Sequence, residues 1–411
     1  MKNLRETIKN IKVNLKAKNK KPQLTIEGID NVTFPLDLFE SKQSKMNIQY
    51  ERAKVYSERL KYKIENLFKD MQIDATFLDT HIAGVFLVYK YKVHEYVSTE
   101  YIEKIKMSIS KILGFFLLPN VSMLEDRNEM AIVIPLTACE ENYCVPIDNK
   151  LLFGRKNIDN ANEMIMGLTI ENELLEYNID DYRNMLVVGQ AGCGKTTWFD
   201  QILMSMMSRN SPSDIKIGLI DFSGSQYIGY DGLPYMLTDV VSDIDKVKML
   251  LERINKEVDY RYKTFIENNV ENIQEYNDME SKSDKPKFAK WTIVIEEIHQ
   301  VKQQNEDVFQ LLVDLLSKIH SISNVGIHFI VSLQTPKIIT EELKQSFDLI
   351  ATMRLFGSID SEKILGEKGA ESLNTKGDIL LKYDGSLVRL QSSYISDTEK
   401  LTIFDYLKKN K

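Results

Sequence analysis

The sequence predicts an α/β fold with a mostly parallel sheet, preceded by a small α+β module. Two observations predict the α/β part: from Leu151 onward short apolar strands alternate with helices, and a glycine-rich turn joins one of these strands to the next helix. Before Leu151, the strands instead group around one helix. We therefore expect a basic N-terminal arm with a polar helix (residues 1–70), the α+β module (71–150) and the α/β domain (151–411).

The glycine-rich turn is the strongest local signal in the chain. Met185–Val188 is typical of a buried parallel strand, and residues 189–196, Gly-Gln-Ala-Gly-Cys-Gly-Lys-Thr, match the phosphate-binding loop. Glycines let backbone N–H groups surround phosphate oxygens, and the helix opening at Lys195 adds the positive end of its dipole. Lys195 can reach the β- and γ-phosphates of ATP, and the Thr196 hydroxyl can bind Mg²⁺. The predicted nucleotide-binding residues are Gly189, Gln190, Ala191, Gly192, Cys193, Gly194, Lys195, Thr196 and Thr197.

Cys193 lies within this loop. A thiolate is favoured beside Lys195 and at the start of a helix, so we expect the pKa of Cys193 to fall. A maleimide should then inactivate the protein, and Mg-ATP should protect it. The alternative is that the loop shields Cys193 and that only Cys139 or Cys144 reacts.

Composition excludes several protein classes. The hydrophobic content of 43% and the charged content of 27% are ordinary for a globular protein, and no apolar run approaches the length of a membrane span. Three cysteines argue against a disulfide framework, and Cys139 and Cys144 have no second pair with which to bind a metal. We expect a cytoplasmic protein.

Charge is distributed unevenly. Residues 1–21 carry eight Lys or Arg and one Glu, a net charge of +7, which leaves −14 for the rest of a chain whose total is −7. A basic arm can contact nucleic acid or anionic lipid, and it can equally be a solvated terminus. Both interpretations stay open.

Periodicity places the remaining elements. Before Leu151 we expect strands at Gln23–Glu27, Ala75–Phe77, Gly84–Val93 and Met130–Pro135. We also expect a long polar helix at Ser41–Gln72 and a second helix at Ser98–Phe115, which Ser98 caps. After it, besides the strand before the turn, strands are expected at Ile215–Asp221, Thr292–Ile295, Ile327–Leu333, Leu349–Phe356, Gly377–Tyr383 and Leu387–Gln391. Asp243–Glu267 is a clear amphipathic helix, and the polar residues 278–290 predict a surface loop.

Polar residues follow two of these strands. Glu296 and Glu297 come directly after Trp291–Ile295, so one carboxylate can serve the Mg²⁺ ion and the other can polarise the attacking water. The alternative is a pair of surface acids at the start of a helix, which its dipole favours. Gln334 ends another strand and can sense the γ-phosphate or orient water.

Many short segments on both sides of the loop match one family pattern in the same order. They are Leu152–Arg155, Met166–Leu168, Ile220–Asp221, Tyr230–Thr238, Arg261–Tyr262, Asn272–Asn277, Gly326–His328, Leu333–Gln334, Asp360–Ser361, Ile364–Leu365, Gly369–Glu371 and Gly377–Leu380. Over roughly residues 72–396, the chain resembles the FtsK/SpoIIIE family of DNA-pumping ATPases, also described as HerA/FtsK-type P-loop ATPases.

The resemblance implies a RecA-like motor domain that assembles into a ring, usually a hexamer, through which double-stranded DNA is threaded. ATP would be hydrolysed between subunits. By position in the family pattern, Thr196 and Glu296 would serve Mg²⁺ and Glu297 would be the catalytic carboxylate. Gln334 would be the sensor, and Arg354 would donate positive charge to a neighbour's nucleotide.

The chain also departs from the family pattern. The family's Asp-Glu pair is Glu296-Glu297 here, and a longer first acid is expected to hold the metal less tightly. Three positions at which the family has a cation fall on Ser223, Thr335 and Ser323 or their neighbours. The membrane-spanning N-terminus and the C-terminal winged-helix domain of the family are not expected in this sequence.

We therefore expect an ATP-hydrolysing ring motor that translocates double-stranded DNA, in conjugative or phage-like transfer. Its expected partners are duplex DNA and further copies of itself, with membrane contact only through a partner or the basic arm. Two alternatives stay open: a protein-transport ATPase of the type VII secretion kind, and a nucleotide-dependent scaffold with impaired hydrolysis.

Overall fold

The structure is a computed structural model, and it describes residues 34–114, 119–124, 128–136, 144–154, 163–181, 183–280, 287–318, 323–374 and 376–410. These residues belong to a single compact unit of the chain, residues 32–411. The basic arm and the strand expected at Gln23–Glu27 lie outside the described residues.

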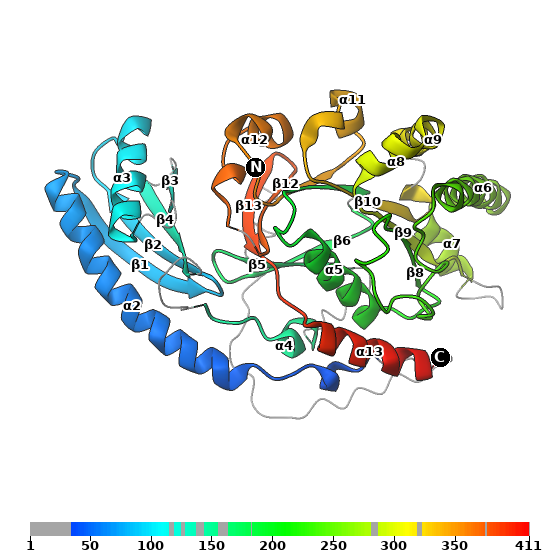
Figure 1. The fold of residues 1–411 in the computed structure, drawn as a ribbon, viewed down its shortest axis with the longest axis horizontal. Helices are drawn as coiled ribbons and strands as arrows, with labels where there is room; N and C mark the ends of the chain where they lie inside the picture. Colours follow the sequence, from blue (N-terminus) through cyan, green and yellow to red (C-terminus); the bar gives the residue numbers. More distant parts are fainter. Residues whose placement is uncertain are drawn as a thin grey trace. The chain divides into compact units, whose positions relative to one another are not determined.

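Among the described residues there are two sheets, and the larger has nine strands in the order β6-β5-β13-β12-β11-β7-β10-β9-β8 (Figure 1). The strands are β5 (Glu163–Thr169), β6 (Leu174–Asn178), β7 (Asn184–Val188), β8 (Ile215–Ile220), β9 (Lys290–Ile295), β10 (Ile327–Leu333), β11 (Leu349–Thr352), β12 (Asp378–Tyr383) and β13 (Ser386–Gln391). The five strands from β11 to β8 pair in parallel, and the other four extend the sheet with antiparallel pairs. The predicted α/β fold is confirmed. The parallel arrangement brings the carboxyl ends of β7, β9 and β10 to one edge.

Helices cover both faces of this sheet. They are α4 (Asn149–Gly154), α5 (Lys195–Arg209), α6 (Ile244–Asn268), α7 (Ile273–Glu280), α8 (Ile298–Gln304), α9 (Glu306–Ser317), α11 (Glu341–Lys344), α12 (Ser358–Leu365) and α13 (Asp397–Lys409), with 3₁₀ turns at Leu36–Leu38, Pro336–Ile338 and Ala370–Ser372. Alternate residues of β7 enter two different cores, with Met185 and Val187 on one face and Leu186 and Val188 on the other. Burial on both faces explains why parallel strands such as β7 are apolar throughout.

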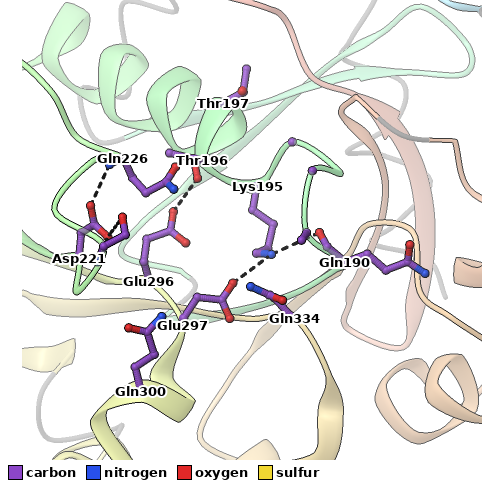
Figure 2. A pocket seen from close by; sticks show the side chains of 14 residues that line it. Gln190, Lys195, Thr196, Thr197, Asp221, Gln226, Glu296, Glu297, Gln300 and Gln334 are labelled. Carbon is purple, nitrogen blue, oxygen red and sulfur yellow. Dashed lines mark hydrogen bonds and ion pairs between the residues drawn. The ribbon is translucent and has the colours of Figure 1, made fainter. Parts of the chain in front are cut away.

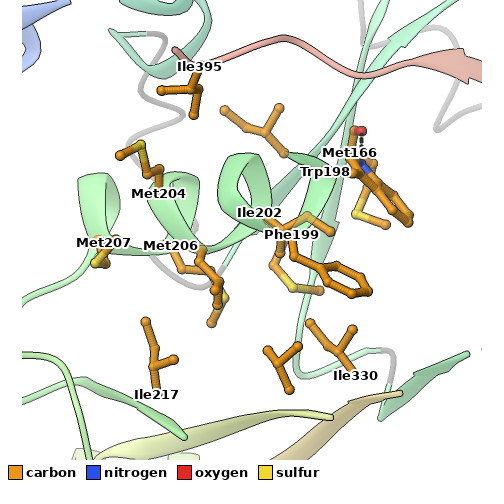
Figure 3. Packing of buried hydrophobic residues seen from close by; sticks show 14 of the residues in the cluster. Met166, Trp198, Phe199, Ile202, Met204, Met206, Met207, Ile217, Ile330 and Ile395 are labelled. Carbon is orange, nitrogen blue, oxygen red and sulfur yellow. Dashed lines mark hydrogen bonds between the residues drawn. The ribbon is translucent and has the colours of Figure 1, made fainter. Parts of the chain in front are cut away.

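Helix α5 is buried around nearly its whole circumference. Trp198, Phe199 and Ile202 are fully buried (Figure 3). The core that they enter also contains Phe404 of α13. The Trp198 indole donates a hydrogen bond to Met166 O at 2.7 Å, which satisfies its one polar group. The start of α5 is therefore held firmly beneath the glycine-rich loop.

The smaller sheet has four antiparallel strands in the order β1-β2-β4-β3. Its elements are α2 (Gln43–Asp70), β1 (Ala75–Ala83), β2 (Phe86–Val93), α3 (Thr99–Ile112), β3 (Asn120–Leu124) and β4 (Glu129–Pro135). Leu87, Tyr89 and Tyr91 alternate along β2 and enter the core that the sheet shares with both helices. The predicted Ser98 cap is present, because its hydroxyl accepts from Tyr101 N. The small α+β module is confirmed, but it also includes α2, which the sequence assigned to the N-terminal segment 1–70.

Several element boundaries differ from those predicted. Strand β11 ends at Thr352 rather than Phe356, because beyond it the chain bonds to the loop after β7, with Gln190 N donating to Arg354 O at 3.0 Å. The expected loop at 278–290 is shorter, since α7 continues to Glu280 and β9 begins at Lys290. Strands β3, β5 and β6 and helix α13 are further elements that sequence periodicity did not predict. No helix among the described residues is long and apolar enough to cross a membrane.

Candidate functional site

The glycine-rich loop runs from the end of β7 to the start of α5, as predicted (Figure 2). Gly192 and Gly194 have φ values of +76° and +108°, a backbone conformation that residues with a Cβ rarely adopt. A Cβ on Gly189 would lie 2.8 Å from both Cys193 Sγ and Met353 Cβ. The loop therefore requires glycine at these positions for conformation and for space.

Lys195 is buried at the start of α5 and points across the loop. Its ammonium group donates to Gly189 O at 2.7 Å and lies 3.2 Å from Glu297 Oε1. The lysine is thus paired with a carboxylate that lies just after β9, the second strand along from β7. A phosphate entering the loop would compete with that carboxylate for the same cation.

Glu296 is held by three hydroxyl groups. Its Oε1 accepts from Thr196 Oγ1 at 3.0 Å and from the Tyr227 hydroxyl at 3.0 Å, and its Oε2 accepts from Ser332 Oγ at 2.9 Å. Burial raises the pKa of Glu296, while the three hydroxyls and Lys195 act in the opposite direction. Burial also raises the pKa of Tyr227 well above its usual value, so this phenol remains a hydrogen-bond donor.

Glu297 occupies an unusual backbone conformation between β9 and α8. Its φ of +57° and ψ of +62° lie in the left-handed region, which costs a non-glycine residue on the order of 1–3 kcal/mol. Its backbone N–H donates to Ser332 Oγ at 3.2 Å, and its Oε2 lies 3.3 Å from His299 Nδ1. The surrounding contacts hold this carboxylate toward Lys195 despite the strain.

A cavity of about 490 Å³ brings most of the predicted site residues together. Figure 2 shows Lys195 and Glu297 pointing toward one another with Gln334 beside them. The cavity is lined by Gln190, Ala191, Gly192, Gly194, Lys195, Thr196, Thr197, Asp221, Ser223, Gln226, Glu296, Glu297, Gln300 and Gln334. Arg354 does not line it. The Arg354 side chain is exposed, although its backbone carbonyl accepts from Gln190 N.

The residues around Thr196 fit a magnesium ion that arrives with a nucleotide. Thr196 and Glu296 supply a hydroxyl and a carboxylate oxygen that already lie 3.0 Å apart, and Mg²⁺ prefers such oxygen ligands, completed by phosphates and water. Within the described ranges, no group of three or more His, Cys, Asp or Glu could hold a metal without such help. The donor set fits a metal–nucleotide pair rather than a metal bound by protein alone.

The expectation that the pKa of Cys193 is lowered is wrong. Its side chain is 1% exposed, and its Sγ lies 3.5 Å from Met353 Sδ. Burial raises the pKa of Cys193, and this outweighs the lowering effect of Lys195. The sequence placed the cysteine correctly at the start of a helix, but it does not reveal that Met353, just after the neighbouring strand β11, covers the sulfur.

Sequence reasoning gave no role to Tyr227, His299 or Ser332, although all three contact the two acids. Ser332 lies near the carboxyl end of β10, which is a usable signal for this edge of the sheet. Tyr227 lies in a turn that buried Asp221 organises, because the Asp221 carboxylate accepts from the backbone N–H groups of Ser225 and Gln226. Nothing in the spacing of Tyr227 indicates its contact.

The FtsK/SpoIIIE family model matches residues 155–375, more than half of the chain. A relative from Listeria monocytogenes serovar 1/2a, named DNA translocase FtsK, is 25% identical over 91% of this chain and 50% of its own length. The relative of the same name from Campylobacter jejuni serotype O:2 is 24% identical over 88% of this chain and 39% of its own length. The chain thus spans about half or less of the length of these relatives.

Solved structures with low sequence identity share the fold. The conjugation coupling protein TcpA of pCW3, solved as a monomer form with ATPγS, gives a TM-score of 0.57 at 18% identity and covers 89% of this chain and 100% of its own. The cytoplasmic domain of the type VII secretion ATPase EccC from Thermomonospora curvata gives a TM-score of 0.53 at 20% identity. That match covers 71% of this chain and 34% of the EccC chain.

Proposed function

Because the chain belongs to the FtsK/SpoIIIE family, we propose that it is an ATPase that translocates double-stranded DNA. The observation that carries the ATPase part is the meeting of Lys195, Thr196, Glu296 and Glu297 in one cavity, at the carboxyl ends of three parallel strands. The duplex-DNA part rests on the relatives named DNA translocase, which match along most of this chain.

The proposed chemistry follows from these side chains. The loop N–H groups and Lys195 bind the β- and γ-phosphates, and Thr196 with Glu296 serves the cation that accompanies ATP. Mg²⁺, when bound, neutralises part of the phosphate charge. As the phosphates take Lys195 from Glu297, the Glu297 carboxylate becomes available to accept a proton from the attacking water. Gln334 at the end of β10 orients that water or senses the γ-phosphate.

We also propose that the protein works as a ring, with a hexamer as the expected size. Support comes from Arg354, which is exposed close to the loop but outside its cavity. An arginine in that position can act on the nucleotide of a neighbouring subunit rather than on its own. In this proposal residues 151–411 form the motor in the cytoplasm and residues 71–150 form a module before it. The polar helix α2, from residues 1–70, packs into the core of that module.

A role in conjugative or phage-like DNA transfer is the finer proposal. It is supported by the match to TcpA, a conjugation coupling protein whose whole solved chain is covered. The fold is also that of EccC, so a protein-transport ATPase remains the alternative from another class. The two alternatives differ in whether duplex DNA stimulates hydrolysis.

The experiment measures ATP hydrolysis by the full chain alone, with double-stranded DNA and with single-stranded DNA. Stimulation by duplex DNA supports the translocase. Hydrolysis that neither polymer changes favours protein transport, and absence of hydrolysis with retained nucleotide binding favours a scaffold.

A further inference from the structure

The carboxylate of Glu296 is held in one orientation by its hydrogen-bond partners. A glutamate has one more rotatable bond than an aspartate, so it loses more conformational freedom when its carboxylate is fixed in one orientation. Both oxygens of Glu296 nevertheless have fixed partners, with Thr196 and Tyr227 on Oε1 and Ser332 on Oε2. Thr196 belongs to the predicted cation site itself, which leaves Tyr227 and Ser332 as groups that act on the carboxylate from outside.

Tyr227 is itself held rigidly. Its side chain is 3% exposed, and its ring meets the Tyr230 ring edge-on at 5.5 Å between centroids. The Tyr230 hydroxyl donates to Asp200 Oδ1 at 2.8 Å, and Lys400 Nζ donates to Asp200 Oδ2 at 2.9 Å. Tyr227 is therefore packed against a network that joins α5 to α13.

We propose that the Tyr227 hydroxyl is a positioning group, which keeps the Glu296 carboxylate turned toward Thr196 for the cation that arrives with ATP. This inference rests on the ATPase proposed above. The hydroxyl touches Glu296 but does not line the cavity, so it acts through the carboxylate and not on the nucleotide. Removing a partner that orients a metal-binding group typically weakens metal affinity by roughly 10- to 100-fold.

Two phenylalanine substitutions form a matched pair. Tyr227→Phe removes the hydroxyl that contacts Glu296, and Tyr230→Phe removes the hydroxyl that contacts Asp200. Both tyrosines are buried, and the rings that pack together remain in each variant. The two variants therefore differ in which carboxylate loses a donor.

The readout is the affinity for fluorescent mant-ADP, measured with excess Mg²⁺ and again with EDTA. For Tyr227→Phe we expect the gain in affinity from Mg²⁺ to shrink by about tenfold, with the EDTA value unchanged. For Tyr230→Phe the gain should equal that of the wild type. The Mg²⁺ concentration for half-maximal ATP hydrolysis should rise for Tyr227→Phe alone.

If Mg²⁺ raises the mant-ADP affinity of Tyr227→Phe as much as that of the wild type, the inference is overturned and the ATPase proposal stays intact. The same holds if Mg²⁺ does not raise the mant-ADP affinity of the wild type. A wild-type protein that binds no nucleotide under either condition overturns both. If Tyr227→Phe does not fold, Ser332→Ala removes the donor to the other oxygen of Glu296 and should reduce the same Mg²⁺ gain. An undiminished gain there contradicts the proposal.

Discussion

The Lys195 ammonium group lies 3.2 Å from Oε1 of Glu297, and both side chains are largely buried, at 7% and 12% exposure. The cation of the phosphate-binding loop is thus paired with the proposed catalytic carboxylate. Binding and hydrolysis place different demands on the two partners, because only Lys195 would contact the phosphates.

Glu297→Gln should therefore bind ATP and fail to hydrolyse it. An amide cannot accept the proton of the attacking water, and loss of a general base typically lowers the rate by roughly 10²- to 10⁴-fold. Nucleotide binding and steady-state hydrolysis, measured on one preparation, separate these effects. Lys195→Ala is the comparison variant and should lose both. Normal hydrolysis by Glu297→Gln would show that another group accepts the proton.

Cys193 should resist maleimide in the native protein. Its sulfur is buried against Met353, and burial raises the pKa of its thiol, so little thiolate is exposed. Cys144 is partly exposed and should react faster. Mass spectrometry of the labelled peptides, with and without denaturant, measures both rates. Rapid native labelling of Cys193 would mean that the loop opens far more readily than this packing implies.

His328 should make stability depend on pH. Burial is the main cause that lowers the pKa of His328 from 6.5 to about 4, so the unfolded chain binds a proton more readily than the folded one. The contribution of neutral His328 to the free energy of unfolding is complete above pH 6.5. As the pH falls from 6.5 through 4, the free energy of unfolding decreases by up to about 3 kcal/mol.

Denaturant unfolding of wild type and His328→Gln between pH 7.5 and pH 4 provides the measurement for this histidine. The difference between the two unfolding free energies should change steeply in the window from pH 6.5 to pH 4 and be flat above it. A constant difference across the whole range would mean that His328 titrates normally in the folded protein.

The sequence was sufficient where function and local structure depend on neighbouring residues. The apolar residues of β7, the glycines and Lys195 lie in one continuous segment, so the loop could be predicted in place. The contact between Tyr227 and Glu296 joins residues 69 positions apart, and no periodicity reports it. Likewise, Lys400 of α13 donates a hydrogen bond to Asp200 of α5, 200 positions away. The packing of α13 therefore depends on a tertiary contact that local sequence does not report. The pKa of Cys193 was mispredicted for the same reason, since Met353, 160 positions away and just after β11, covers its sulfur.

Arg354→Ala should bind ATP and form rings, yet hydrolyse slowly, if this arginine serves a neighbour's nucleotide. Mixed with Lys195→Ala protein it should regain some activity, because mixed rings contain interfaces with an intact loop and an intact arginine. Lys256→Ala, which removes an exposed cation on α6, is the control and should hydrolyse normally. No recovery in the mixture, with rings present, would show that Arg354 does not act between subunits.

Movement along duplex DNA tests the proposed motor most directly. A third-strand oligonucleotide is bound to a long duplex, and its release is followed after addition of the protein and ATP. We expect ATP-dependent displacement by the wild type and none by Glu297→Gln. Robust ATP hydrolysis by the wild type on this duplex, with the third strand still bound, would contradict a translocating motor.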